Sequence, residues 1–351
     1  MNVVISGDPL SDGIEGDLFI TWDEPCSKYS HVCIGDLVEQ NRTKYRDIYL
    51  NWLLTLEVFE RGIDKAGSGN ANSIWFQSVQ SSNFFGKSSI HSSSNIEDVL
   101  KIIALEDHLS NLQVSKVNCI NMHSRVSESI RSWCEQKGIL FTGSQIETPK
   151  HSWIGFDRVI GLVKGTYWIL NEIRFGWRFR GVGLRRWFEH SNKLIFQSYL
   201  VRPPIIRDGV IQNEEFYGGL PKFLSENGVG VDWFYIIQRS NQIRSNTIAV
   251  KVLKDLNNKI IRNNFVTPYT FLNVILIFKV FLIFYMNSIR LSILFYKKKP
   301  IFSFKGFNLN SLFQNAIIDG IAGMGLAKCI FYQEIFRIAL GADKKDVGVV
   351  Y

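Results

Sequence analysis

The chain has 351 residues, of which 46 % are hydrophobic, 21 % charged and 13 % aromatic. This composition can fill a core, so it excludes a wholly disordered chain, a collagen-like fibre and a small disulfide-stapled scaffold. The five cysteines form no CxxC pair, so we expect reduced thiols in a cytoplasm and no bound metal. The N-terminus lacks a basic stretch followed by an apolar one, and no secretory signal is expected.

The net charge of +8 conceals two halves of opposite sign. Residues 1–150 hold 13 Lys and Arg against 19 Asp and Glu, a net charge of −6, whereas residues 151–351 hold 27 against 13, a net charge of +14. An acidic surface repels phosphate and a basic surface attracts it. We therefore expect a domain boundary near Lys150 and a phosphate-bearing partner for the second half.

The first half alternates between predicted strands and helices. We expect strands at 3–6, 17–22, 73–78, 116–121 and 139–142, and helices at 44–61, 95–109 and 124–138. Glu97 and Asp98 fall in the first turn of the second of these helices, where acidic residues are favourable. Strand–helix–strand repetition is typical of βαβ units, so residues 1–150 predict an acidic, Rossmann-like α/β domain with a mainly parallel sheet. No GxGxxG or Walker-type loop follows a strand, which leaves a usual dinucleotide site unsupported.

The second half is expected to contain two parts. Residues 151–192 predict a basic helical connector, with one long helix over roughly 153–189. Residues 193–351 predict a second α/β region, with strands at 193–200 and 231–238, a short helix at 222–227 and a hydrophobic helix at 271–296.

Five arginines lie within thirteen residues of the predicted connector, among aromatic side chains: Arg174, Arg178, Arg180, Arg185 and Arg186. Guanidinium groups bind phosphate oxygens in a bidentate way, so the cluster fits a phosphate or anion site. The phosphate could belong to a sugar nucleotide, a polyprenyl diphosphate or a lipid headgroup. A solvated helix face, or an interfacial helix with tryptophan anchors, explains the same residues equally well.

The predicted hydrophobic helix, 271–296, is long enough to cross a bilayer. Lys279 would lie near its middle and Arg290 divides the remainder, so a clean span is disfavoured. On a helix, Lys279, Arg290 and Lys297 fall within about 20° of one another, which predicts a cationic membrane stripe on an apolar helix. We expect this helix to lie in a membrane interface with the stripe toward lipid phosphates. A buried core helix and a true span remain open as alternatives.

Three further features are candidate sites. Gly320, Gly323 and Gly325 precede the last predicted helix and could present backbone N–H groups to a phosphate, although their spacing favours close helix packing. Glu334 on that helix could act as a catalytic base or bind a sugar hydroxyl, against the simpler interpretation of a surface residue. His123 is a catalytic candidate because it follows a predicted strand, where the loops of open sheets gather functional groups.

The N-terminal segment is rich in carboxylates: Asp8, Asp12, Glu15, Asp17, Asp23 and Glu24. Paired carboxylates can transfer protons or hold a hard metal ion. No DxD motif is present, however, and Asp23 and Glu24 precede a proline. An ordinary turn is the favoured interpretation of this pair.

The order of several segments resembles a family of bacterial surface-carbohydrate biosynthesis proteins from O-antigen and capsule loci. The likeness covers most of the chain and rests on LEDH at 105–108, WC at 133–134, GI at 138–139, LIFQSYL at 194–200, FYGGLP at 216–221, VDWFY at 231–235, FYQE at 331–334 and AL at 339–340. Members look like glycosyltransferases of the GT-B type, so the resemblance implies a GT-B-like first half and a sugar nucleotide as substrate. Family members of this kind are longer, and the resemblance therefore implies an incomplete second α/β region and a chain truncated at its C-terminus.

Together with the resemblance, these features predict glycosyl transfer to a lipid-linked acceptor in O-antigen or capsule synthesis, without a bound cofactor. The expected partners are anionic membrane lipid or a lipid-linked saccharide, together with a sugar nucleotide, at the cytoplasmic face of the inner membrane. The alternative is a non-catalytic or truncated membrane-associated scaffold of the same pathway. Nucleic-acid binding is disfavoured by the acidic half and by the absence of a binding motif.

Overall fold

The computed structural model describes residues 1–8, 14–24, 31–52, 94–143, 154–187, 194–260, 263–298, 302–341 and 349–350. The chain divides into two compact units. Unit 1 comprises Met1–Val163 and Asn287–Leu326, and unit 2 comprises Lys164–Met286 and Ala327–Tyr351. This division differs from the expected domains 1–150, 151–192 and 193–351, because residues 287–326 belong to the first unit. The predicted strand at 73–78 and the end of the predicted helix at 44–61 lie outside the described residues.

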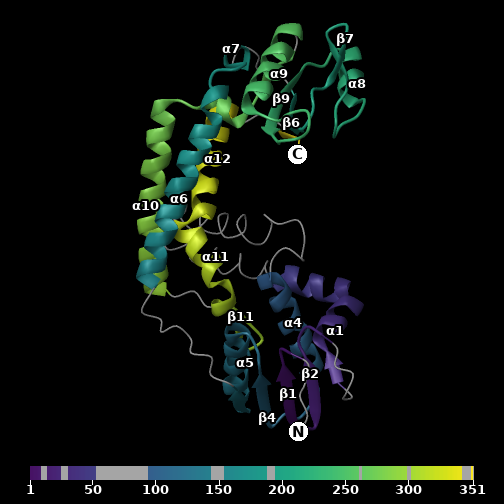
Figure 1. The fold of residues 1–351 in the computed structure, drawn as a ribbon, viewed down its shortest axis with the longest axis vertical. Coiled ribbons are helices and arrows are strands. Elements are labelled where there is room, and N and C mark those ends of the chain that lie inside the picture. The colour runs from purple at the N-terminus through teal and green to yellow at the C-terminus, as the bar shows by residue number, and fades with distance from the viewer. Residues whose placement is uncertain are drawn as a thin grey trace. The chain divides into compact units, whose positions relative to one another are not determined.

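Unit 1 contains a five-stranded parallel sheet in the order β3–β2–β1–β4–β5 (Figure 1). The strands are β1 (Asn2–Ser6), β2 (Leu18–Thr21), β3 (His31–Cys33), β4 (Lys116–Ile120) and β5 (Leu140–Gly143). The central strand β1 buries Val3, Val4 and Ile5 completely, as is typical of a strand covered on both faces. The prediction of an α/β domain with a parallel sheet is confirmed, and β3 is an addition to it.

The helices of unit 1 include α1 (Ile34–Gln40), a helical stretch at 42–52, α4 (Ser94–Leu109), α5 (Ser124–Lys137) and α11 (Asn310–Ala322). The helices α1 and α5 contact strands of the sheet, whereas α11 packs on α4 and α5. The end of α5 was predictable because Gly138 adopts a positive φ of 69°. Its amide then reaches the carbonyls of Cys134 and Glu135, which is the usual glycine-terminated end of a helix.

A short antiparallel hairpin at 303–308 lies in the late segment Asn287–Leu326 and attaches it to the rest of unit 1. Its strands are β11 (Ser303–Phe304) and β12 (Phe307–Asn308). The ring of Phe307 stacks on Trp133 of α5, with centroids 5.3 Å apart. The indole of Trp52 donates a hydrogen bond to the carbonyl of Ser303 at 2.9 Å. These aromatic contacts explain why residues so late in the sequence belong to the first unit.

Unit 2 contains a four-stranded sheet in the order β10–β9–β6–β13, and its described pairings are all parallel. The strands are β6 (Leu194–Leu200), β9 (Val231–Ile237), β10 (Phe265–Val266) and β13 (Val349–Val350). The unit also includes the antiparallel pair β7 (Ile205–Arg207) and β8 (Val210–Asn213), the helices α8 (Leu220–Glu226) and α9 (Asn246–Lys259), and the 3₁₀ turn η5 (Pro268–Phe271). Aromatic side chains of β9, among them Trp233 and Phe234, are buried at its centre.

The long helix predicted over 153–189 is interrupted. The segments are α6 (Ile154–Gly176), the 3₁₀ turn η4 (Trp177–Phe179) and α7 (Leu184–Trp187). Gly176 ends α6 against the ring of Tyr269, where a Cβ would lie 2.2 Å from the ring atom Cδ1. Gly181 and Gly183 then take positive φ angles of 75° and 77°, which turn the chain away from a helical path.

Two more long helices are α10 (Val274–Lys298) and α12 (Met324–Leu340). Each of α6, α10 and α12 has residues in both units. Within unit 2, Trp168 of α6 meets Phe331 of α12 edge-on, with ring centroids 5.6 Å apart. The hydroxyls of Thr166 on α6 and Tyr285 on α10 lie 2.8 Å apart. The three helices therefore pack side by side in this unit (Figure 1).

Candidate functional site

A cleft lies at the carboxyl ends of the unit 1 strands. From β1 the chain proceeds to β2 and β3 on one side, and it then crosses to β4 and β5 on the other, so the strand order reverses between β1 and β4. Ligands of open α/β sheets bind at such a switch point. The cleft has a volume of about 450 Å³, and its lining includes Trp22, Asp23, Glu97, Asp98, Lys101 and His123.

The loops after β1 and β4 approach each other closely at the floor of this cleft. The amide of Gly7 donates to the carbonyl of Ile120 at 3.0 Å, and a Cβ on Gly7 would lie 2.2 Å from the carbonyl oxygen of Asn121. Asn121 itself has a positive φ of 51°, a conformation that asparagine adopts more readily than most residues. Only glycine fits at position 7, and the tight loop fixes the backbone that leads into His123.

Lys101 connects α4 with the loop after β2. Its side chain is buried, and its Nζ atom lies 2.5 Å from Asp23 Oδ1 and 2.6 Å from Glu97 Oε1. Burial alone would lower the pKa of Lys101, but its hydrogen bonds and charge interactions with the two carboxylates raise that pKa above its ordinary value. The lysine is therefore charged, and it holds both carboxylates at one wall of the cleft.

Asp98 is the carboxyl group of the cleft best suited to proton transfer. The indole Nε1 of Trp22 donates a hydrogen bond to Asp98 Oδ1 at 3.1 Å. Burial raises the pKa of Asp98, and it outweighs the Trp22 hydrogen bond and the charges of Lys101 and His123, which lower it. A carboxyl group with a raised pKa in a cleft is a candidate acid or base.

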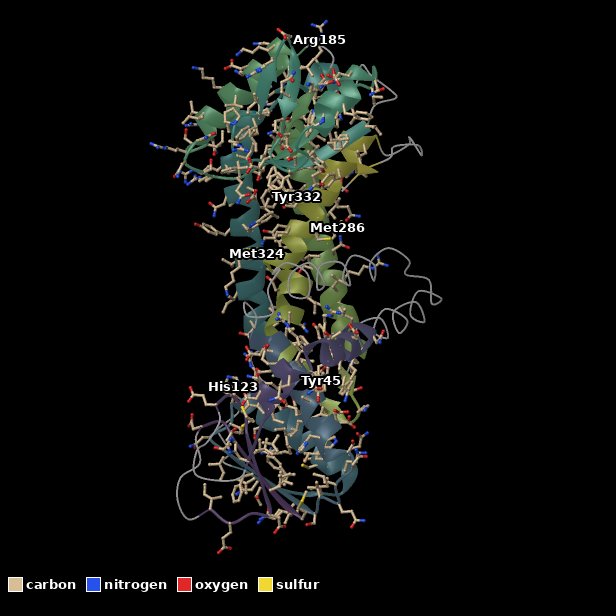
Figure 2. The ribbon with its side chains drawn as sticks, turned by 90° about the vertical axis from the view of Figure 1, so that its right-hand side faces the viewer. Tyr45, His123, Arg185, Met286, Met324 and Tyr332 are labelled. Atoms are coloured by element: carbon tan, nitrogen blue, oxygen red, sulfur yellow. The ribbon has the colours of Figure 1, made fainter. Side chains whose placement is uncertain are left out.

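His123 brings an imidazole to the same cleft. It occupies the N-cap position of α5, but its side chain makes no capping hydrogen bond and is exposed at the surface of unit 1 (Figure 2). The cleft thus presents one imidazole beside several carboxyl groups, among them Asp8 and Asp98. Such an acidic lining favours hydroxyl-bearing or cationic ligands over phosphate.

The arginines of the predicted anion site lie on several segments of unit 2. Arg174 is exposed at the end of α6, and Arg185 is exposed on α7. Arg186 also belongs to α7, but its side chain lies outside the described residues. Because the helix is interrupted at Gly176, the cluster does not form a single helix face.

The contacts of Arg178 and Arg180 are with neighbouring segments of unit 2. The Nη1 atom of Arg178 donates to the hydroxyl of Thr247 at 2.8 Å, near the start of α9. The guanidinium of Arg180 lies over the ring of Trp177, 5.1 Å from its centroid. Both side chains are exposed, and guanidinium N–H groups can donate hydrogen bonds to phosphate oxygens.

The three glycines of the predicted loop belong to the junction of two helices. Gly320 lies within α11, Gly323 is the C-cap of α11, and Gly325 lies within α12. The amide of Gly325 donates to Asp319 Oδ2 at 3.0 Å, and a Cβ on Gly323 would lie 2.4 Å from Oδ1 of the same carboxylate. The carboxylate of Asp319 therefore occupies the position at this junction where the candidate glycine loop would bind a phosphate.

Glu334 and Lys279 form one ion pair, although the sequence predicted separate roles for them. Lys279 Nζ lies 2.8 Å from Glu334 Oε2, and Arg337 Nη2 lies 3.1 Å from the same atom. Glu334 is only 9 % exposed, and burial raises its pKa. The carboxylate is neither a surface group nor open to a substrate; instead it holds Lys279 against α12.

The predicted cationic stripe of Lys279, Arg290 and Lys297 is therefore not a continuous outward belt. Lys279 turns inward to Glu334, Arg290 is exposed, and the side chain of Lys297 lies outside the described residues. The outward side of α10 is apolar. In the described part of the chain, Val274–Ile293 is the one stretch long and apolar enough to cross a membrane, with mean hydropathy 1.9 and 28 % of its residues buried.

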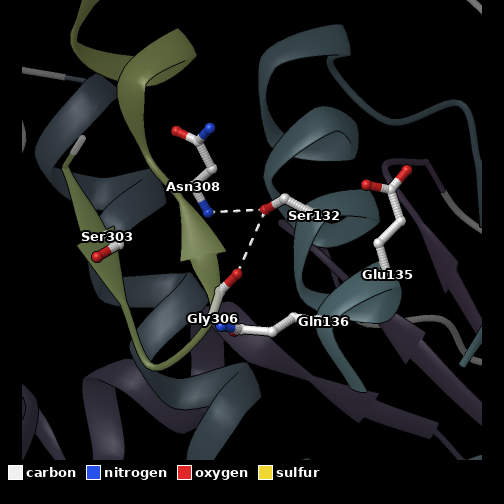
Figure 3. A pocket seen from close by; sticks show the side chains of 6 residues that line it. All are labelled: Ser132, Glu135, Gln136, Ser303, Gly306 and Asn308. Carbon is white, nitrogen blue, oxygen red and sulfur yellow. Dashed lines mark hydrogen bonds between the residues drawn. The ribbon is translucent and has the colours of Figure 1, made fainter. Parts of the chain in front are cut away.

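A second cavity of unit 1, about 530 Å³, lies between α5 and the β11–β12 hairpin (Figure 3). The hydroxyl of Ser132 accepts a hydrogen bond from the amide of Asn308 at 2.7 Å and lies 3.5 Å from the carbonyl of Gly306. These bonds attach the hairpin to the helix. We interpret the cavity as a structural joint, and the cleft at the switch point as the functional site.

Comparison of the chain with models of protein families, with curated proteins and with solved structures found no match. The candidate site therefore depends on the geometry of the cleft. Of the residues that line it, sequence analysis selected only His123 as catalytic. Sequence analysis assigned Asp98 to a helix terminus and Asp23 to a turn. The signal that could have placed both residues in one cleft is the shared carboxyl edge of β1, β2 and β4.

Proposed function

We propose that this protein is a membrane-associated glycosyltransferase of the GT-B type that acts in O-antigen or capsule assembly. It transfers a sugar from a sugar nucleotide to a lipid-linked acceptor at the cytoplasmic face of the membrane. The observation that carries the proposal is the switch-point cleft, with Asp98 and His123 in one of two parallel-sheet α/β units. Two such units are what a GT-B enzyme requires, and the segment order resembles surface-carbohydrate proteins.

In this proposal the cleft of unit 1 receives the acceptor. A saccharide hydroxyl is neutral and tolerates the acidic lining, whereas a diphosphate would be repelled. His123 accepts the hydroxyl proton as the oxygen bonds to the anomeric carbon, and the bond from that carbon to the diphosphate breaks with its electron pair. Asp98 stabilises the protonated imidazole, since its charge interacts with that of His123.

The donor diphosphate suits the basic surface of unit 2. Arg174, Arg178 and Arg180 are exposed there, and guanidinium groups stabilise the negative charge that develops on a leaving diphosphate. The acidic and basic halves of the sequence thus match the two substrates, one hydroxylated and one anionic.

The test is calorimetry of the full chain with UDP-, GDP- and CMP-sugars, followed by product analysis with a lipid-linked acceptor. We expect one nucleotide class to bind and His123→Ala to lower turnover by about 10²-fold or more. Lys137→Ala, an exposed residue at the other end of α5, is the matched control and leaves turnover unchanged.

Two results would contradict the proposed function. If none of the sugar nucleotides binds and no product forms, the protein is not a glycosyltransferase, and a non-catalytic scaffold of the pathway explains the same fold. If product forms equally well with His123→Ala, the cleft is not where the proton is accepted.

A further inference from the structure

The outer side of α10 is an uncovered apolar surface. Ile275, Phe278, Met286 and Ile289 are 81 %, 71 %, 61 % and 61 % exposed, and Figure 2 labels Met286 on this helix. Single exposed hydrophobic residues are ordinary on a protein surface. A continuous apolar patch along one helix is unusual on a protein surface, and such a patch marks an interaction site.

The exposed residues share one face of the helix, which we call the α10 face: Ile275, Phe278, Leu282, Met286, Ile289 and Ile293. They are spaced by three or four residues, which places them within about 80° of each other around the helix axis. The opposite side is covered, because Leu276, Val280 and Phe284 are buried. One helix thus has one side in the protein interior and one side without a protein partner among the described residues.

Cationic residues border the α10 face. Arg290 lies on its flank and is exposed, and three lysines, Lys297–Lys299, follow at the end of the helix in the sequence. Exposed cations beside an apolar helix face attract anionic lipid headgroups. We propose that the α10 face docks on the surface of an anionic lipid bilayer. This inference deepens the membrane association in the proposed function by naming the surface that performs it.

The charged flank of α10 determines how the helix meets the bilayer. Lys279 lies on the same flank as Arg290; it is paired with Glu334 of α12, and Arg337 joins the same carboxylate. A helix that crossed the membrane would carry these charged partners into hydrocarbon, which is costly. The α10 helix therefore lies in the interface, with its apolar face among the upper acyl chains and Arg290 near the phosphates.

Sedimentation of the full chain with vesicles of phosphatidylethanolamine and phosphatidylglycerol tests this inference. We expect wild type to sediment with these vesicles and bind at least fivefold less to phosphatidylcholine vesicles. Ile275→Glu with Met286→Glu places two charges on the α10 face, and we expect at least a tenfold loss of binding. Ile248→Glu, on the exposed side of α9, is the matched control and stays within twofold of wild type.

Four outcomes would overturn the inference. They are equal binding of the double variant and wild type, equal loss in the control, resistance of the bound wild type to alkaline carbonate, and a wild-type dimer that the double variant disrupts without any vesicle binding. Circular dichroism confirms that the variants fold. The failure of the proposed function can be distinguished from the failure of this inference. If the wild-type protein binds vesicles but no sugar nucleotide, the docking surface is supported and only the proposed glycosyltransferase activity is contradicted.

Discussion

The helices α4 and α10 both carry long apolar runs and one inward lysine, but they differ in what covers them. In α4 the apolar side chains between Ile96 and Leu109 are all buried in unit 1. In α10 a whole side remains exposed. Lys101 of α4 meets two carboxylates at the wall of a cleft, whereas Lys279 of α10 meets the buried carboxylate of Glu334. Two apolar helices therefore differ in that one is a core helix and the other has an exposed apolar side.

The largest expected difference between these helices is in the free energy of unfolding. Ile103→Ala in α4 removes a buried side chain and should cost about 2–5 kcal/mol. Ile275→Ala in α10 removes an exposed one and should change stability by no more than about 0.5 kcal/mol. Urea denaturation of both variants without lipid measures the contrast. Equal losses would mean that the α10 face is covered by protein in solution.

The inward lysine of α10 provides a second, smaller contrast. Among the described residues, Lys279→Met leaves the buried carboxylate of Glu334 with Arg337 as its ion-pair partner, and the expected loss of stability is about 1–3 kcal/mol. Adding Glu334→Leu removes the uncompensated charge and should restore most of that loss. A double-mutant cycle by chemical denaturation checks both values. Simple additivity of the two substitutions would show that the ion pair does not couple the helices.

The smallest expected effect concerns the pH dependence of α4. Burial raises the pKa of Asp98 above its usual 3.8, so the folded state retains this proton to a higher pH than the unfolded state. The contribution of Asp98 to stability is therefore full below about pH 4 and falls as the pH rises through the raised pKa. Asp98→Asn cannot ionise, so its stability relative to wild type should increase between pH 4 and pH 8. A constant difference would show that Asp98 is not perturbed.

Much of the fold could be predicted from local patterns. The helix at 124–138 has a glycine at its end, and the strands at 194–200 and 231–237 are short apolar runs between turns. The break of the helix at Gly176 could not be predicted, because its cause is the ring of Tyr269, which is distant in the sequence. The position of the hairpin at 303–308 in unit 1 could not be predicted either, because its contacts are with Trp52 and Trp133, which are distant in the sequence.

The candidate site was predictable only in part. His123 follows a strand, and that position alone indicated function. Asp98 acquires its raised pKa from burial beside Trp22, a neighbour that only the parallel pairing of the strands brings close. Periodicity likewise grouped Lys279 with Arg290, but it could not show that Glu334 draws Lys279 inward.

The central claim is that the exposed side of α10 is covered by lipid, and hydrogen–deuterium exchange with and without anionic vesicles tests it most directly. We predict slower exchange for peptides from 274–293 when vesicles are present, with no change for peptides from α4. Equal exchange of 274–293 in both conditions would contradict the account.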